Sequence, residues 1–300
     1  MAEISQPPRV SHIRPWDENY NALYPLNEGD LDTERQRLDS NHYKVRMPLC
    51  GGLCPPHILQ HLKSLPSPRV IELAAGTGVW LRDLADHLPA SASLVGVDMD
   101  AVKFPPAAEL PPNMTMMQQN ALKPFPDDML GTFDMVHIRL ISMGLKKEDW
   151  EVVARNIYTL LKPGGYVHWE EMYDIGWRCI PPSRPFDEWC RLTALWSIQC
   201  GRDLFMPAQL PNLLEDVGYV GVDDKVWNTF GARGLLRDHM TQVSKQALRP
   251  ILLAIVEGGG LENVQSIKDV DRLEEEMKRD VEENGVLVGF MYTWIWGQRP

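Results

Sequence analysis

The sequence predicts an α/β fold in which a mostly parallel sheet carries helices on both faces. Three observations predict it. Strand and helix patterns alternate between residues 69 and 171. A small-residue turn, ELAAGTG at Glu72–Gly78, follows the first strand and opens a helix, and Asp98 ends the second strand twenty residues later. Such alternation is typical of parallel strands joined by right-handed crossovers.

The first half of the chain supplies most of the expected sheet. A helical pattern over 30–64 has an acidic start and a break at Gly51-Gly52. The helix after the turn repeats apolar residues on one face and ends at Pro89. A proline-rich stretch after Asp98 is too stiff for a long helix. Short apolar runs predict the first four strands, at 69–74, 93–98, 114–119 and 133–138.

The second half is more helical. A helix from Trp150 to Leu161 is stopped by Lys162-Pro163-Gly164-Gly165, and a fifth strand follows at 166–171. A sixth strand is expected at 219–227, and an aromatic strand at 290–296 closes the chain. This last strand fits an antiparallel insertion at the sheet edge. Amphipathic patterns predict the remaining helices, at 183–217, 235–257 and 267–284.

The composition favours a globular protein over a nucleic-acid or membrane protein. The 300 residues carry a formal net charge of −11 and are 44% hydrophobic. Nucleic-acid binding rests on clustered Lys and Arg, and no run of four basic residues occurs. No apolar stretch reaches transmembrane length, and the N-terminal MAEISQPPRV is not a hydrophobic signal segment. We expect a soluble cytoplasmic protein that binds neither nucleic acid nor a membrane.

The cysteines predict neither disulfides nor a metal site. There are five, an odd number at irregular spacing. Cys50, Cys54 and His57 lie at the edge of zinc-site spacing, but no second ligand pair follows them. Buried or unreactive thiols are therefore expected, and no metal.

The turn at Glu72–Gly78 predicts a nucleoside ligand. A strand that enters a tight small-residue turn and then a helix lets the backbone approach a ligand closely, and a carboxylate at Asp98 can accept both ribose hydroxyls. A dinucleotide site would need G-x-G-x-x-G, whereas this turn has Ala74, Gly76 and Gly78. The glycines keep Cβ atoms away from the ligand, and Ala74 is expected to fit with a negative φ.

The pattern E-x-A-x-G-x-G resembles the first motif of class I S-adenosylmethionine-dependent methyltransferases, [DE]-x-G-x-G-x-G. Phe133–Arg139 is similar to their FDxVhxR strand, and Leu160–Gly165 to their LLKPGG. This resemblance implies a Rossmann-like seven-stranded sheet, with a helical lid at 1–60 and a methyltransferase core at 61–300. It also implies substrate-pocket insertions at about 172–215 and 235–285.

A narrower resemblance is to fungal secondary-metabolism methyltransferases of the LaeA-like family. Tyr24-Pro25-Leu26, the Glu34–Leu38 segment and His42 are similar to the YxLPxDxxExxRLxxQH lead-in of that family. Gly76–Trp80 resembles its GTGIW, and the ending Trp296–Pro300 resembles its terminal GRKP. Ala74, Asn41 and Gln298-Arg299 depart from the family pattern.

The resemblance implies S-adenosyl-L-methionine as cofactor and assigns residues to it. Glu72 would lie near the ammonium of the methionyl tail, and Asp98 would bind the ribose. Arg139 would lie near the methionyl carboxylate or the acceptor, with a structural salt bridge as the alternative. His42 would fold over the cofactor as part of the lid. Three residues would contact the adenine: Met99, Asn120 and Ala121.

The implied reaction is an in-line displacement at the methyl carbon, in which the protein aligns the acceptor and excludes water. A phenol acceptor would gain from a base, whereas a carboxylate or free amine would not. Glu171 is the first candidate base because it lies near a strand end. His137 is the second, unless it points into the sheet packing as a core histidine. Three residues are expected to contact the acceptor: Tyr24, Tyr173 and Trp177.

Three functions remain open from the sequence. The first is methylation of O, N, S or C of a small secondary metabolite. The second is a regulator or scaffold of secondary metabolism that keeps the cofactor pocket. The third is a cyclase or pericyclase on the same fold. The acceptor and the oligomeric state are not predicted, because fold does not dictate function.

Overall fold

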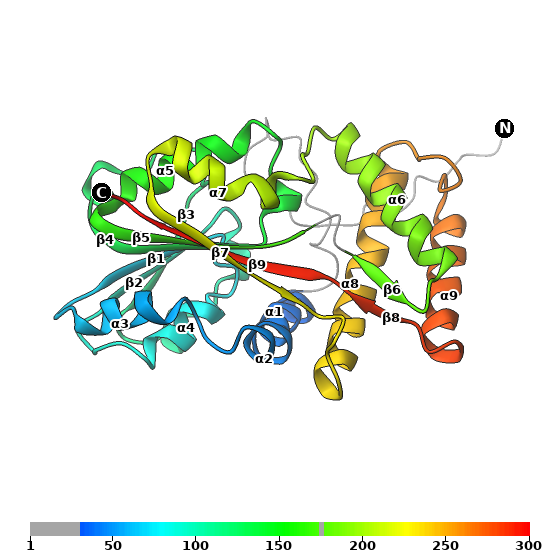
Figure 1. The fold of residues 1–300 in the computed structure, drawn as a ribbon, viewed down its shortest axis with the longest axis horizontal. Helices are drawn as coiled ribbons and strands as arrows, with labels where there is room; N and C mark the ends of the chain where they lie inside the picture. Colours follow the sequence, from blue (N-terminus) through cyan, green and yellow to red (C-terminus); the bar gives the residue numbers. More distant parts are fainter. Residues whose placement is uncertain (1–30, 174–176) are drawn as a thin grey trace.

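The computed structural model describes residues 31–173 and 177–300, without the side chains of 243–247. Within these residues, seven strands form one sheet in the order β3-β2-β1-β4-β5-β9-β7 (Figure 1). Adjacent strands from β3 to β5 are parallel, and β9 pairs antiparallel with both β5 and β7. The bounds are β1 (Arg69–Leu73), β2 (Ser93–Asp98), β3 (Met114–Gln118), β4 (Phe133–Arg139), β5 (Leu161–Met172), β7 (Val220–Asn228) and β9 (Met291–Gln298).

Helices cover both faces of the sheet. In Figure 1, α3 and α4 lie below it, and α5 and α7 lie above it. Four short 3-10 helices lie in the connections that follow strands β2, β3 and β4. They are Ala101–Lys103, Ala107–Glu109, Asp127–Met129 and Ser142–Gly144. The helices are α1 (Leu31–Asn41), a π-helix (His42–Arg46), α2 (Met47–Cys50), α3 (Pro56–Ser64), α4 (Val79–Ala85), α5 (Asp149–Leu160), α6 (Arg184–Gln199), α7 (Met206–Val217), α8 (Leu235–Glu257) and α9 (Ile267–Glu283).

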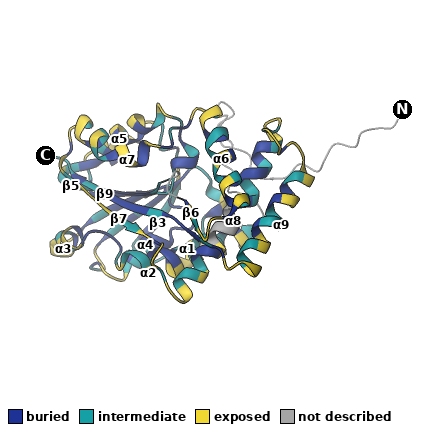
Figure 2. Ribbon diagram, turned by 45° about the vertical axis from the view of Figure 1, so that its right-hand side comes forward, coloured by how far each residue is buried: buried dark blue, intermediate teal, exposed yellow. Residues whose placement is uncertain are grey.

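The core is divided among three apolar clusters. One packs α5 and α7 on one face of the sheet, and a second packs α3 and α4 on the other. Parallel strands covered on both faces are expected to be buried throughout. Strand β4 fits this, because six of its seven residues are buried, and the sheet centre is dark blue in Figure 2.

The third cluster lies outside the sheet layers. It joins α6, α8 and α9 to a small second sheet of β6 (Arg178–Ile180) and β8 (Leu287–Gly289). In Figure 1 these helices stand beside the main sheet rather than on it. Three-residue strands leave too short a pattern for a sequence signal, and β6 and β8 were not expected.

One expectation needs correction. The closing aromatic strand is not at the edge, because β9 lies between β5 and β7, and β7 forms the edge. The interval 172–215 reaches into α7, whose Met206, Leu210 and Leu214 pack in the sheet cluster. The helical pattern over 30–64 contains a π-helix, which brings both His42 and Arg46 inside.

Over the ranges described above, none of the helices combines the length and the apolar character needed to cross a bilayer.

Candidate functional site

The glycine turn is left-handed at three of its positions. Ala74 has φ 53°, Gly76 56° and Gly78 68°. The expected negative φ at Ala74 is therefore wrong. The backbone turns sharply after β1, and the N–H of Ala75 donates to the carbonyl of Val97 on β2. An alanine in the left-handed region costs about 1 kcal/mol relative to its usual conformation.

Side chains pack closely against both glycines. A Cβ on Gly78 would lie 2.5 Å from Cε of Met114, and a Cβ on Gly76 would lie 3.1 Å from Cδ1 of Leu38. Leu38 belongs to α1, so the N-terminal helix packs directly over the turn. The left-handed φ values would strain any other residue at these two positions.

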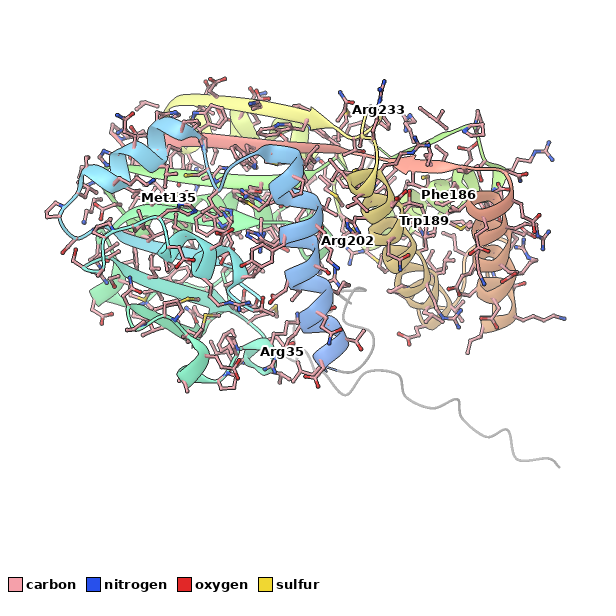
Figure 3. All side chains as sticks on the ribbon, turned by 90° about the horizontal axis from the view of Figure 1, so that it is seen from below. Arg35, Met135, Phe186, Trp189, Arg202 and Arg233 are labelled. Atoms are coloured by element: carbon pink, nitrogen blue, oxygen red, sulfur yellow. The ribbon has the colours of Figure 1, made fainter. Side chains whose placement is uncertain are left out.

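Two further contacts tie α1 to this edge of the sheet. Asp39 accepts from Thr77 Oγ1 at 2.6 Å and from Arg82 at 2.8 Å. Arg35 donates to the carbonyls of Val102, Lys103 and Phe104, which follow β2; Arg35 is labelled in Figure 3. Helix α1 therefore contacts both the glycine turn and the segment after Asp98.

Asp98 is buried at the end of β2, where the turn reaches it. Its Oδ2 accepts from Gly76 N–H at 2.8 Å, and its Oδ1 accepts from Asp100 N–H at 2.9 Å. Burial raises the pKa of Asp98, against the lowering effect of Lys103 and of these two N–H groups. Each carboxylate oxygen has a second lone pair, so both can still accept a ribose hydroxyl.

The ends of β2 and β3 lie side by side. Asn120 is buried, and its side-chain oxygen accepts from Leu122 N–H at 2.9 Å, which sets the side chain in a turn. The carbonyl of Ala121 accepts from Asn156 of α5 at 2.8 Å. Met99 is half-buried, and its carbonyl accepts from Gln118 at 2.9 Å. These three predicted adenine contacts thus lie at one edge, next to Asp98.

A row of polar side chains crosses the buried sheet. The register pairs Glu72 of β1 with His137 of β4, and His137 with His168 of β5. Two residues further along, Arg139 pairs with Glu170. Side chains alternate along strands, so all five lie on one face of the sheet. In the sequence, four of these residues form two short patterns, H-x-R at His137–Arg139 and H-x-E at His168–Glu170.

His137 connects two of these carboxylates. Its Nδ1 lies 3.2 Å from Glu72 Oε1, and its Nε2 lies 2.9 Å from Glu170 Oε1. The ring stacks on Trp80 of α4, with centroids 3.7 Å apart and planes at 12°. With 0% of its surface exposed, His137 is a core histidine. This burial favours the core-histidine alternative over a role as a base.

Glu170 is the centre of a buried ion pair. It accepts from Arg46 through both carboxylate oxygens, and its Oε2 also accepts from Tyr292 Oη at 2.7 Å. Burial alone would raise its pKa, but Arg46 and the His137 hydrogen bond hold the pKa of Glu170 well below its usual range. Burial by itself would lower the pKa of Arg46, but the charge and hydrogen bonds of Glu170 outweigh this effect and raise the pKa above its usual value.

Arg46 and Tyr292 were not predicted from the sequence. Arg46 comes from the π-helix, and it also donates to the carbonyls of Gly52 and Leu53 at 2.6 Å each. Tyr292 comes from β9, more than a hundred residues after Glu170. A single arginine in a helical pattern and a single tyrosine in an aromatic strand give no signal that could have found this contact.

His42 and Arg139 lie beside Glu72. The Nε2 of His42 is 2.9 Å from Asp83, and its Nδ1 accepts from Arg139 at 3.1 Å. The Nε of Arg139 lies 3.6 Å from Glu72 Oε1. Burial, then Arg139 and Arg46, lowers the pKa of His42 to about 2. Neutral His42 therefore joins α4 to the end of β4.

Glu171 faces away from this row. It is fully buried, and its Oε1 accepts from Ile141 N–H and from Trp169 Nε1, at 3.0 Å each. This geometry favours a structural role over that of a base.

Tyr173 follows β5 and is half-buried, and burial raises its pKa. Trp177 is buried against Trp189 and Phe290.

The acceptor side is only partly described. Tyr24 lies outside the described residues. Trp177, Trp189 and Trp196 share one apolar cluster with Phe186, and Figure 3 labels Trp189 and Phe186 beside the C-terminal helices. Met206, at the start of α7, packs in the sheet cluster. The aromatic side chains thus come from α6 and the loop after β5.

One group of side chains has the composition of a metal site. Ligand atoms of His137, His168 and Glu170 lie within 4.8 Å of one another. However, Glu170 already accepts from Arg46 through both oxygens, and this guanidinium is a buried positive charge beside the group. We therefore assign these three residues to the ion-pair network rather than to a cation.

The described residues fit the cofactor that the sequence implies. Glu72 is completely buried, and among the described residues its Oε2 has no hydrogen-bond partner. Such a buried atom is costly unless a donor reaches it, and a ligand ammonium is a suitable donor. Glu72, the glycine turn and Asp98 are adjacent at the carboxyl ends of β1 and β2, where α/β folds bind nucleosides.

Comparison with known proteins agrees with this site. A family model described as a methyltransferase domain matches residues 70–165, which contain the turn, Asp98, Asn120 and Arg139. Methyltransferase grgD of Penicillium sp is 28% identical over 279 residues, covering 88% of this chain and 92% of that protein.

Two other relatives are also fungal. N-methyltransferase tcpN of Claviceps purpurea is 26% identical over 265 residues, covering 84% of this chain and 90% of that protein. Secondary metabolism regulator laeA of Coprinopsis cinerea is 33% identical over 159 residues, covering 51% of this chain and 36% of that protein. With this strand order and this turn, the chain is similar to class I S-adenosyl-L-methionine-dependent methyltransferases of the fungal secondary-metabolism type, and residues 70–165 match their methyltransferase domain.

Proposed function

We propose that this protein transfers a methyl group from S-adenosyl-L-methionine to O, N, S or C of a small-molecule acceptor in a fungal biosynthetic pathway. One observation carries the proposal. A left-handed glycine turn lies between a buried carboxylate with an unpartnered oxygen, Glu72, and a strand-end carboxylate, Asp98. That arrangement offers acceptors for an ammonium and for a ribose at the two ends of one turn.

The proposed roles follow from these positions. Asp98 accepts the ribose hydroxyls, Asn120 meets the adenine edge, and Glu72 accepts from the ammonium. Arg139 lies beside Glu72 and balances its charge. Helix α1, with Leu38 over the turn, acts as the lid expected from the N-terminal resemblance and excludes water. Bound there, the cofactor supplies an electrophilic methyl group on a sulfonium.

Among possible acceptors, an amine fits the described residues best. Both ring nitrogens of His137 lie at hydrogen-bond distance from carboxylates, and Glu171 Oε1 accepts from two N–H groups. These contacts favour structural roles for both residues over proton removal. A neutral amine attacks without losing a proton first, whereas a phenol would need a base. The relative tcpN is named an N-methyltransferase. The protein then contributes alignment of the acceptor with the methyl carbon.

Two measurements test the proposal. Isothermal titration with S-adenosylhomocysteine should show binding, and labelled S-adenosylmethionine should transfer its methyl to a metabolite of a producing-strain extract. Binding without transfer to any metabolite would indicate a regulator or scaffold, and a product of unchanged mass would indicate a cyclase. Either result would overturn methyl transfer as the function.

The ribose assignment has its own test. Asp98→Ala should weaken S-adenosylhomocysteine binding by about 1.5–3 kcal/mol for each charged hydrogen bond lost. Asp128→Ala removes an exposed carboxylate from the 3-10 helix at Asp127–Met129 and should leave the affinity unchanged. Equal affinities for the two variants would show that Asp98 does not bind the ribose.

A further inference from the structure

We propose that His137 is a positioning residue for the methionyl end of the cofactor. The inference rests on the proposed function and deepens it, because it names what holds Glu72 in place. His137 bridges Glu170 and Glu72 by hydrogen-bond distances of 2.9 and 3.2 Å. It thereby directs one carboxylate oxygen of Glu72 inward and leaves Oε2 for the ligand.

The imidazole is held so that it cannot turn away. Trp80 stacks on one face of the ring at 3.7 Å, which fixes its plane. Glu170 fixes the edge of the ring that carries Nε2, and Glu170 is itself held by Arg46 and Tyr292. The remaining ring nitrogen, Nδ1, can then reach only Glu72.

The bridge links the lid segment to the cofactor site. Arg46 lies in the π-helix directly after α1, and it pairs with Glu170. From there the contacts run through His137 to Glu72, so three strands and the π-helix together set the position of one carboxylate. A buried carboxylate with a single rotamer is preorganised for its ligand, which lowers the entropic cost of binding.

His168 provides a matched control. It lies beside His137 in the register, on the same face and with the same 0% exposure. Yet neither of its ring nitrogens has a hydrogen-bond partner among the described residues, and Nδ1 is 3.8 Å from Glu170 Oε1. Burial lowers the pKa of His168, so it stays neutral. A change at His168 perturbs the same core without touching Glu72.

The test compares two ligands that differ in the amino-acid tail, the end of the cofactor that His137 is proposed to serve. S-adenosylhomocysteine carries this tail, and 5′-methylthioadenosine has the same adenosine and sulfur but neither the ammonium nor the carboxylate. Titration calorimetry is run on wild type, His137→Phe, His137→Gln and His168→Phe, with circular dichroism confirming that each is folded. Phenylalanine keeps the stacking on Trp80 and removes both hydrogen bonds.

The expected result is selective. His137→Phe should bind S-adenosylhomocysteine about tenfold more weakly, since a charged hydrogen bond is redirected, and bind 5′-methylthioadenosine within twofold of wild type. His137→Gln keeps an N–H donor for one of the two carboxylates and should lose about threefold, so the prediction does not depend on the phenylalanine variant folding. His168→Phe should affect neither ligand selectively.

Other outcomes separate the two proposals. If wild type binds neither ligand, the proposed function fails. If wild type binds S-adenosylhomocysteine but the His137 variants bind it equally well, the positioning role is wrong. Equal losses for both ligands, or the same selective loss in His168→Phe, would also overturn it, because the effect would then be general damage to the core.

Discussion

Replacing Arg46 with methionine should destabilise the fold by about 3–5 kcal/mol, the usual cost of leaving one partner of a buried ion pair. Glu170 is 0% exposed and Arg46 3% exposed, so solvent cannot replace the guanidinium. The backbone carbonyl of Gly52 would lose this donor as well, whereas the carbonyl of Leu53 would keep a second donor, Trp80 Nε1. A typical domain has only about 5–15 kcal/mol of stability, so the loss should be large in any unfolding curve.

Urea unfolding followed by tryptophan fluorescence measures this cost. Arg155→Met is the control, because Arg155 pairs with Glu151 on the surface, where both side chains are more than half exposed, and its loss should cost less than about 1 kcal/mol. The double variant Arg46→Met with Glu170→Met removes both charges and should be more stable than Arg46→Met alone. The reasoning is refuted if Arg46→Met and Arg155→Met unfold at the same urea concentration.

The remaining predictions concern the turn, acid stability and a thiol. Ala74→Gly should raise the free energy of unfolding by about 0.5 kcal/mol, because relief of a left-handed alanine exceeds the entropy cost of glycine; a clear loss in urea unfolding would contradict this. Below pH 6.5 His42 is protonated in the unfolded chain but not in the folded chain, where its pKa is about 2. The free energy of unfolding should therefore decrease as the pH is lowered, by up to about 1.4 kcal/mol per pH unit. His42→Gln should remove that share of the slope between pH 6.5 and 5, and an unchanged slope would count against it. Burial raises the pKa of Cys54 to about 12, so iodoacetamide at pH 8 should label it only after unfolding, as peptide mass spectrometry can check.

Local patterns were enough to predict the nucleoside edge of the sheet. The turn, Asp98 and the strand ends lie within short stretches of chain, and each has a spacing that one kind of backbone produces. The observed strands β1 to β4 begin and end within about a residue of the expected ranges. The left-handed Ala74 was missed, since an alanine gives no sign of a positive φ, although its place in a glycine pattern could have suggested it.

The tertiary structure alone decided which polar groups meet. The facing of His137 depends on the register of β4 between β1 and β5, and a shift of one residue would have turned it to the other face. Arg46 and Tyr292 reach Glu170 across more than a hundred residues of chain. Such contacts follow from packing that no local pattern encodes. The sequence by itself therefore predicted a nucleoside site, whereas only the fold decided which side chains surround Glu72 and Glu170.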